Sequence, residues 1–295
     1  MPELPEVETA VRSLRKNLER KVITSVSVLK PYPLKYNSPE DLEDSVLGKR
    51  ITSIDRRGKY ILLTLESVTP SFHYPTVLMV HLGMTGALIY KPSDRWYHAY
   101  PPTICNHIFL EFHLDDGGIL FFSDYRRFGS VRAFSLGALF NPDTAPAHLK
   151  GFLELGVEPF EPGAEEKFLT AVRQSRYAYK PIKGVLLDQR VVAGIGNIYA
   201  SEACFAAGVN PHRSVHTLSD DELRTIFRSS VEIMAKSIEL GGSSIKDYVD
   251  GEGVSGSFQH HLKVYAQSFC PSCNSQIVVT TIDDRATFHC PQCQS

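Results

Sequence analysis

Residues 107–122 read HIFLEFHLDDGGILFF, two apolar runs on either side of the polar turn Asp115–Gly118. Aspartate and glycine between two such runs favour a tight reversal of the chain, so this stretch predicts an antiparallel hairpin. Further runs rich in β-forming residues lie at short intervals, at residues 22–29, 50–55, 60–65, 76–83 and 118–124. Many short strands in succession predict a β-sandwich or barrel that reaches to about residue 135.

Helical patterns lie on both sides of this β region. Apolar residues repeat at helical spacing at Val7, Val11, Leu14 and Leu18. They predict a helix over about residues 5–20, with Pro5 in its first turn. The later helical segments are 165–175, 184–189, 197–208 and 219–238, and the last begins with Ser219 and Glu222 in capping-box register. The fold class that we expect is therefore α+β.

The composition is that of an ordinary globular protein. The chain has 295 residues, 43% of them hydrophobic, which allows two domains and a small appendage. No apolar run suits a membrane span, and none follows Met1 as a signal peptide requires, so we expect a soluble cytoplasmic protein. The formal net charge of −2 argues only weakly against a nucleic-acid partner, because phosphate binding needs a local basic face rather than a basic average.

Four cysteines gather near the end of the sequence. Two C-x2-C pairs, separated by sixteen residues, are formed by Cys270, Cys273, Cys290 and Cys293. Each pair can supply two corners of a tetrahedron, and the chain between them can form a hairpin, so the spacing predicts a zinc ribbon with one structural zinc ion. Arg285 lies on that hairpin, where a guanidinium can reach a phosphate or a base edge.

Two further stretches suggest contact with nucleic acid. Residues 173–190 carry five basic side chains and one acid, and residues 191–202 then form a Gly-x-Gly turn that leads into a helix with Asn197 at the N-cap position. Such a turn favours an anion, although a charged helix face and an ordinary turn explain the pattern equally well. Residues 124–129, DYRRFG, place two cations beside Phe128, which suits a partly unstacked duplex unless that ring is a core side chain.

The N-terminus is the most informative stretch for chemistry. Removal of Met1 gives Pro2 a free secondary amine, which is a nucleophile if burial or a nearby cation such as Lys59 lowers its pKa. Attack on a sugar C1′ gives an iminium ion, which acidifies the neighbouring carbon and promotes elimination. Glu3 is the adjacent acid or base, and Glu6 lies in the first helical turn. The alternative is that the proline simply begins a helix.

Seven stretches in order resemble the bacterial formamidopyrimidine-DNA glycosylases over nearly the whole chain. They are PELPEVET (2–9), RRGKYILL (56–63), HLGMTG (81–86), DYRRFG (124–129), AGIGNIYASE (193–202), GGSSIKDY (241–248) and RATFHCPQCQ (285–294). The resemblance implies a base-excision repair enzyme that removes oxidised purines and then nicks the strand by β,δ-elimination. It implies an N-terminal catalytic β-sandwich with its leading helix (1–136), a helix-two-turns-helix domain (137–258) and a zinc finger (259–295), with DNA in the cleft between.

The resemblance also implies roles for individual residues. Pro2 corresponds to the Schiff-base nucleophile, Glu3 to the general acid and Lys59 to the catalytic lysine that contacts phosphate, with Glu6 as support. The gap left by the extruded base would be filled by Met84, Arg126 and Phe128, with Arg126 facing the orphaned cytosine. The DNA would also be bound by His107, Lys183, Asn197 and Arg285, the last of these being part of the catalytic set. Residues 243–257 correspond to a loop that covers the lesion.

Some stretches depart from the family pattern. Cys105 stands where the family has a histidine, which leaves His107 alone and puts one phosphate contact in question. We expect Cys105, like Cys204, to be a small buried residue. Residues 264–270 form a shorter approach to the finger than usual. Residues 67–75 and 93–102 resemble insertions, which we expect to be surface loops rather than new sites.

Other functions are consistent with parts of the sequence. An endonuclease VIII-type enzyme would use the same nucleophile on oxidised pyrimidines, but Leu4 and the long loop after Gly242 favour the purine branch. A DNA-binding relative without activity would have no need for Pro2, Glu3 and Lys59, and a zinc-ribbon interaction module explains only the last thirty residues. We therefore expect damaged double-stranded DNA as the partner of a monomeric enzyme that needs no nucleotide cofactor and no membrane.

Overall fold

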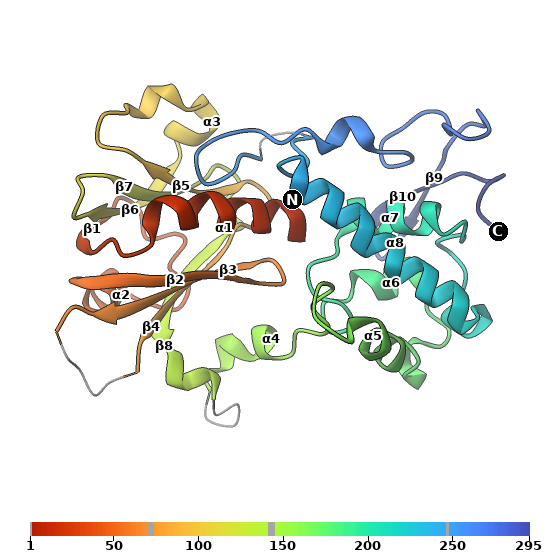
Figure 1. Cartoon of the computed structure of the whole chain (residues 1–295), viewed down its shortest axis with the longest axis horizontal. Coiled ribbons are helices and arrows are strands. Elements are labelled where there is room, and N and C mark those ends of the chain that lie inside the picture. The colour runs from red at the N-terminus through yellow and green to blue at the C-terminus, as the bar shows by residue number, and fades with distance from the viewer. Residues whose placement is uncertain (1, 70–73, 141–144, 246–247) are drawn as a thin grey trace. The chain divides into compact units, whose positions relative to one another are not determined.

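The fold is taken from a computed structural model that describes residues 2–69, 74–140, 145–245 and 248–295. The predicted processing of Met1, and parts of the predicted insertion at 67–75 and of the predicted loop at 243–257, fall outside these residues. The chain divides into two compact units (Figure 1). The first runs to Leu153 and includes Gly241–Ser257, and the second comprises Glu154–Leu240 and Phe258–Ser295. The three predicted domains and their boundaries stay a prediction.

The first unit contains two four-stranded antiparallel sheets, as a β-sandwich requires. One has the order β1 (Ile23–Val28), β6 (Ile108–Leu114), β7 (Ile119–Asp124) and β5 (Gly86–Lys91). The other has the order β2 (Lys49–Arg57), β3 (Tyr60–Ser67), β4 (Thr76–His81) and β8 (Ser130–Ser135). Both sheets and the N-terminal helix contribute to one apolar core. Three short helices complete the unit, α2 (Pro39–Val46), α3 (Pro102–Cys105) and α4 (Lys150–Leu153).

The hairpin predicted at residues 107–122 is confirmed as β6–β7. Its turn is held by Asp116, whose carboxylate accepts the Gly118 N–H at 3.0 Å, while Gly117 has a positive φ of 78°. Successive side chains of a strand point to opposite faces, and Leu120 and Phe122 lie in the main core whereas Phe121 lies in a second, smaller core on the other face. Strand β5 is buried along its whole length, and this lack of alternation is why the sequence did not reveal it.

Helix α1 (Leu4–Leu18) confirms the predicted N-terminal helix. Glu3 is its N-cap residue and Pro5 lies in the first turn, where a missing N–H costs no intrahelical bond. The four apolar residues that predicted the helix are all fully buried, at Val7, Val11, Leu14 and Leu18. The buried face fixes the helix on the sandwich, so the residues that precede it are fixed as well.

The predicted insertion at 93–102 is more than a surface loop. It forms a short 3-10 helix, η1 (Tyr97–Ala99), and leads into α3. Tyr100 is buried in the second small core, together with Ile104 and Phe121. Most residues of 93–102 are exposed, as a surface loop requires, whereas the Tyr100 ring is buried and covers an apolar face of the sheet.

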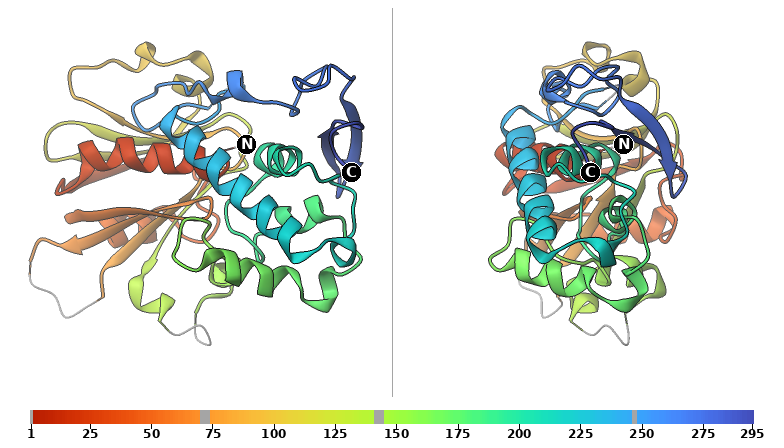
Figure 2. Two further views of the ribbon diagram at one scale, coloured as in Figure 1. Left: turned by 45° about the vertical axis from the view of Figure 1, so that its right-hand side comes forward. Right: turned by 90° about the vertical axis from the view of Figure 1, so that its right-hand side faces the viewer.

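The second unit is mostly helical, with α5 (Ala164–Val172), α6 (Ile182–Leu187), α7 (Asn197–Ala206) and α8 (Asp220–Glu239). Helix α8 packs against α5 and α7 (Figure 2), and the predicted capping box of Ser219 and Glu222 is confirmed at its start. The N-cap residue of α7 is Gly196, so the prediction of Asn197 at that position was off by one residue. Short 3-10 turns link its elements, η4 (Ser175–Tyr177), η5 (Val215–Thr217) and η6 (Phe258–His261), and two more, η2 (Leu136–Leu139) and η3 (Ala147–Leu149), belong to the first unit.

A two-stranded hairpin of β9 (Val278–Ile282) and β10 (Arg285–His289) completes the second unit. The approach to it is held by Glu202, a 3% exposed carboxylate of α7 that accepts three backbone N–H groups. They come from Lys263, Val264 and Tyr265, at 2.8 to 3.0 Å. A buried carboxylate needs hydrogen-bond donors, so Glu202 holds these three N–H groups and thereby orders a stretch of backbone that has no regular structure. Within the described residues no helix has the length and apolar character that a membrane span requires.

Candidate active site and metal centre

The N-terminal residues are held in place by a reciprocal pair of hydrogen bonds. Pro2 is buried directly before α1, and Glu3 and Glu6 form a capping box. The Glu3 N–H donates to Glu6 Oε2 at 2.8 Å, while the Glu3 side chain accepts the N–H of Glu6. Glu3 is 2% exposed and Glu6 1%. The backbone that carries the Pro2 nitrogen therefore has a fixed direction relative to the helix.

Glu6 also binds a segment far away in the sequence. Its Oε1 accepts the Ser243 N–H at 2.8 Å, and its backbone carbonyl accepts the Tyr248 hydroxyl at 2.7 Å. Burial, followed by the nearby Glu6 charge, raises the pKa of Tyr248 well above its ordinary value, so the hydroxyl stays a proton donor. One carboxylate thus joins the turn that carries Pro2 and Glu3 to the start of the predicted capping loop.

Lys59 lies in the turn between β2 and β3 and is 8% exposed. The turn is tied to α1 by Arg56, which donates to Glu8 at 3.0 Å and to the Gly58 carbonyl at 3.0 Å. Burial opposes ionisation of Glu8, but hydrogen bonds from Arg12 and Arg56 hold its pKa below the ordinary value. The turn that carries the lysine is therefore fixed to α1 by a partly buried ion pair.

The turn that carries Met84 is held by a neutral histidine. His81 Nδ1 accepts the Gly83 N–H at 3.1 Å, and Met84 follows with a partly exposed side chain. Burial lowers the pKa of His81 to about 4, with further lowering by the charges of Lys59, Arg132 and Lys35. A neutral imidazole is required here, because a protonated Nδ1 could not accept this hydrogen bond.

The loop that carries Arg126 and Phe128 is organised by Asp124, which is 0% exposed. One carboxylate oxygen accepts the Thr85 hydroxyl at 2.5 Å and the Arg126 N–H at 3.3 Å. The other accepts the Tyr32 hydroxyl at 2.9 Å and the Gly129 N–H at 2.7 Å. Four donors thus converge on one side chain from both sides of the loop.

The three predicted gap-filling residues lie on two loops in direct contact. A Cβ atom at Gly83 would lie 2.6 Å from the Phe128 carbonyl carbon, so the turn with Met84 packs on the loop with Phe128. Phe128 is 52% exposed, which excludes the alternative of a core side chain, and the Arg126 guanidinium lies 5.1 Å from the centre of its ring. An exposed ring beside a cation has the chemistry that stacking on nucleobases requires.

His107 lies beside this loop. Its carbonyl accepts the Asp124 N–H at 3.1 Å, and its ring is 6.0 Å from that of Tyr125. Its Nδ1 has no hydrogen-bond partner in the part of the chain that the structure describes. Cys105, predicted to be buried, is partly exposed instead, because it ends the short helix α3 at the surface.

In the second unit, Lys183, Asn197 and the tip of the hairpin lie together. Lys183 is 0% exposed, and its Nζ donates to Asn197 Oδ1 at 2.6 Å, Thr287 Oγ1 at 2.8 Å and the Ala286 carbonyl at 3.2 Å. Asn197 Nδ2 donates to the same carbonyl at 2.9 Å. Arg285, the neighbouring residue, is exposed. The buried lysine orders the hairpin, and Arg285 is the most accessible cation of this group.

The basic stretch at 173–190 does not form one free cationic surface. Arg173 pairs with Asp220 at 2.6 Å and Arg190 with Asp188 at 2.8 Å, while Lys183 is buried. The Gly-x-Gly turn that follows is held by Gln189, whose side chain accepts the Gly194 N–H at 2.9 Å. Helix α7 begins at Asn197 without a side-chain hydrogen bond from its N-cap residue Gly196.

The four cysteines form a cluster that fits a tetrahedral metal ion. Their sulfur atoms all lie within 4.8 Å of one another, with Cys270 and Cys293 at 3.8 Å and Cys273 and Cys290 at 3.4 Å. Zinc–sulfur bonds of about 2.3 Å in a tetrahedron place the sulfur atoms about 3.8 Å apart. Gln294 supports the cluster, since its Oε1 accepts the Cys290 N–H at 2.8 Å. The cluster can therefore bind a metal ion.

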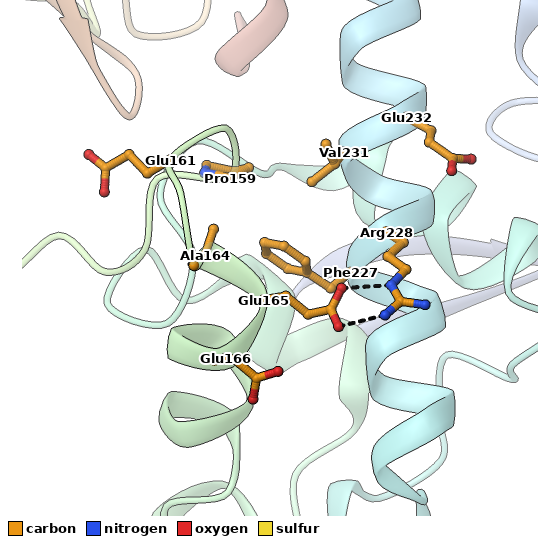
Figure 3. Close-up of a pocket in the computed structure, with 10 residues that line it drawn as sticks. Pro159, Glu161, Ala164, Glu165, Glu166, Phe227, Arg228, Val231 and Glu232 are labelled. Carbon is orange, nitrogen blue, oxygen red and sulfur yellow. Dashed lines mark hydrogen bonds and ion pairs between the residues drawn. The ribbon is translucent and has the colours of Figure 1, made fainter.

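A pocket of about 330 Å³ lies elsewhere, between α5 and α8 (Figure 3). It contains the pair Glu165–Arg228, and hydrogen bonds from Arg228 and Arg224 lower the pKa of Glu165 to about 2. No predicted site residue lines it. The sequence did not identify His81, Asp124 and Glu202 as residues that organise the site. The signal that could have found them is a polar residue at the end of a strand or within an apolar helix.

The fold and the site together define a DNA glycosylase of base-excision repair. The family model of the formamidopyrimidine-DNA glycosylase N-terminal domain matches residues 1–131, and that of the formamidopyrimidine-DNA glycosylase H2TH domain matches residues 155–249. The chain belongs to the formamidopyrimidine-DNA glycosylase family. This confirms the α+β architecture of β-sandwich, helix-two-turns-helix domain and four-cysteine finger.

Relatives and solved structures match over the whole chain. The formamidopyrimidine-DNA glycosylase of Desulforamulus reducens is 38% identical over 100% of this chain and 99% of its own length. That of Moorella thermoacetica is 40% identical over 94% and 93%. A Lactococcus lactis Fpg (MutM) in complex with N7-benzyl-Fapy-dG DNA is 32% identical, with a TM-score of 0.82 and 99% coverage of both chains. The Lactococcus lactis Fpg has also been solved with DNA that contains an abasic site.

The low pKa of His81 predicts that the stability of the fold depends on pH. Because folding lowers the pKa of His81 from 6.5 to about 4, its contribution is fully present above pH 6.5 and is lost as the pH falls toward 4. His81→Asn keeps an acceptor for the Gly83 N–H without titrating. We expect the wild type to lose up to about 3 kcal/mol of unfolding free energy relative to this variant between these pH values. Urea unfolding at several pH values measures this, and parallel curves would contradict it.

Asp124→Asn is expected to destabilise the first unit. An amide in place of the carboxylate turns an NH2 group toward N–H or O–H donors, which leaves buried groups without acceptors. The loss should be about 2–4 kcal/mol, with faster amide exchange at residues 126–129. Tyr32→Phe is the matched control, since it removes one donor and should cost about 1 kcal/mol. Equal stability of Asp124→Asn and the wild type in urea unfolding would show that the carboxylate does not organise the loop.

Proposed function

We propose that the chain is a bifunctional glycosylase and abasic-site lyase that removes 8-oxoguanine and formamidopyrimidines from duplex DNA. The observation that carries the proposal is the capping box of Glu3 and Glu6, which holds a buried Pro2 in a fixed position at the start of α1. A helix that merely begins with a proline needs no second contact such as the one from Ser243 to Glu6. The family match and the DNA complexes of the Lactococcus lactis enzyme support this reading.

The chemistry follows from a secondary amine. After Met1 is removed, the Pro2 nitrogen attacks C1′ of the damaged nucleotide, and the bond from C1′ to the base breaks. The base takes a proton as it leaves, and Glu3 protonates the ring oxygen as the sugar opens to an iminium ion. The iminium acidifies the C2′ proton, so the 3′ phosphate is expelled by β-elimination and the 5′ phosphate by a second elimination.

The remaining predicted residues would bind the DNA. Lys59 would contact a phosphate next to the reacting sugar, and His107, Asn197 and Arg285 would contact further phosphates. Buried Lys183 supports this group by ordering the hairpin next to Arg285. The space left by the extruded base would be filled by Met84, Arg126 and Phe128, which recovers part of the stacking energy that extrusion costs.

We propose zinc as the metal of the four-cysteine cluster. Four thiolates at tetrahedral spacing leave no open coordination position, so the ion is structural and takes no part in the reaction. It would hold the ends of the hairpin that carries Arg285. A single copy of the chain supplies every residue of this mechanism, and the mechanism needs no nucleotide cofactor.

The substrate range has one specific alternative. A Lactococcus lactis Fpg, 31% identical with a TM-score of 0.81, has been solved with DNA that contains an oxidised pyrimidine. An endonuclease VIII-type preference for such bases would use the same nucleophile. Borohydride trapping on duplexes with 8-oxoguanine and with 5-hydroxyuracil decides between them, because the better substrate yields more covalent adduct.

Pro2→Gly is expected to lose most base excision and strand cleavage while duplex binding persists, because the secondary amine is lost and the DNA contacts remain. The measurement is cleavage of an 8-oxoguanine:cytosine duplex, with borohydride trapping and peptide mass spectrometry to locate the adduct. Pro5→Ala, in the first turn of the same helix, is the matched control and should retain activity. Undiminished excision by Pro2→Gly, or an adduct that maps elsewhere, removes Pro2 from the mechanism.

Cys290→Ser is expected to lose the metal and to weaken duplex binding by roughly tenfold or more, because the hairpin that presents Arg285 loses its support. Metal content and fluorescence anisotropy with a labelled duplex measure the two effects. Cys105→Ser, outside the cluster, should change neither. A Cys290→Ser protein that retains its metal and binds DNA as the wild type does would contradict the proposed finger.

A further inference from the structure

The segment Gly241–Ser257 is closed at a narrow neck. A Cβ atom at Gly256 would lie 2.2 Å from the Gly242 carbonyl oxygen, so only glycine allows the two stretches to meet. The Gly256 N–H also donates to Ser244 Oγ at 2.9 Å. The neck is held on one side by Glu6 through Ser243. The position of the rest of the segment must therefore be set by contacts of the residues that lie between the two sides of this neck.

Residues 248–254, which we call the arm, lie against α1 and strand β5 within the first unit. The Gly251 N–H donates to Ser13 Oγ of α1 at 2.8 Å, and its carbonyl accepts the Tyr90 N–H of strand β5 at 2.9 Å. A Cβ atom at Gly251 would lie 2.5 Å from Leu14 Cγ. Val249 is 7% exposed in the second small core. The arm is thus packed between the N-terminal helix and an edge strand.

Residues 93–105, which we call the insert, are packed on the same sheet face. The rings of Tyr97 and Tyr100 lie 5.4 and 5.5 Å from that of Phe121, both edge to face. The Tyr97 hydroxyl donates to Glu111 at 2.6 Å, and the Ile104 carbonyl accepts the buried Ser123 hydroxyl at 2.7 Å. Ring contacts and hydrogen bonds from both of its ends fix the insert on the sheet.

Tyr100 is the residue through which the insert contacts the arm. It is 5% exposed, and a Cβ atom at Gly253 would lie 2.7 Å from its Cε1 atom. Gly253 has a positive φ of 84°, which also favours glycine. Tyr100 and Val249 belong to the same apolar core. The ring therefore fills the space behind the arm.

We propose that the insert is a specificity element, in which Tyr100 holds the arm in the position from which residues 248–254 contact the damaged nucleotide. The inference rests on the proposed function, together with the role that the family resemblance implies for residues 243–257, which is to cover the lesion. An abasic site has no base to cover. Excision of the base therefore depends on the contact between insert and arm, whereas cleavage at a preformed abasic site does not.

The test compares two reactions of the full-length protein under single-turnover conditions. Tyr100→Ala is expected to slow excision of 8-oxoguanine from a duplex by about tenfold or more and to change cleavage of a preformed abasic site by less than about twofold. Gly253→Ala places a Cβ atom too close to the Tyr100 ring, so it disrupts the same contact from the side of the arm and should have the same effect. Hydrogen exchange of the amides of residues 248–254 should become faster in both variants.

Trp96→Ala is the matched control, since Trp96 belongs to the insert but is 74% exposed. It should change neither reaction nor the exchange rates. An equal loss of both reactions in Tyr100→Ala would overturn the inference, as would faster exchange of the arm with unchanged excision. A wild-type protein that excises no 8-oxoguanine contradicts the proposed function instead, and the exchange rates then still decide whether the insert holds the arm.

Discussion

The buried carboxylate of Glu6 is the contact on which the arrangement of the first unit depends. It accepts backbone N–H groups from Glu3 and from Ser243, which lie 240 residues apart in sequence. A buried carboxylate is costly without such donors, so the folded state is favoured only when both stretches are in place. The position of Pro2 follows from this contact, and in the proposed mechanism that leaves the Pro2 nitrogen itself free of the contacts that hold the residue.

Buried carboxylates also organise two other stretches that lack regular structure. Asp124 gathers donors around the loop with Phe128, and Glu202 gathers three N–H groups before the finger. In the proposed function Met84 and Phe128 act on DNA and must stay accessible, so burial of their side chains cannot fix these loops. Hydrogen bonds from the backbone to a buried acid fix a loop while its functional side chains stay outside.

Periodic and local features of the fold could be predicted from the sequence. Helix α1, hairpin β6–β7 and the cysteine spacing depend on residues that are near one another in the chain, and their patterns reflect this. Tertiary contacts could not be predicted. The burial of Lys183 depends on Asn197 and Thr287. The packing of Tyr100 depends on strand β7, which carries apolar side chains on both of its faces. In each case the deciding partner is distant in sequence and has no periodic signature.

Within the first unit, Pro2 and the arm are fixed by different contacts. The capping box places Pro2 through α1, whereas Tyr100, Ser13 and the edge strand place the arm. Glu6 is the point at which the two sets meet, since it binds the neck of the segment and the first turn of the helix. The two sets also meet along α1, where Ser13 Oγ accepts the Gly251 N–H and the Glu6 carbonyl accepts the Tyr248 hydroxyl. Under the proposed function, a change at Tyr100 therefore acts first on the arm, whereas Pro2 is held by the separate capping box of Glu3 and Glu6.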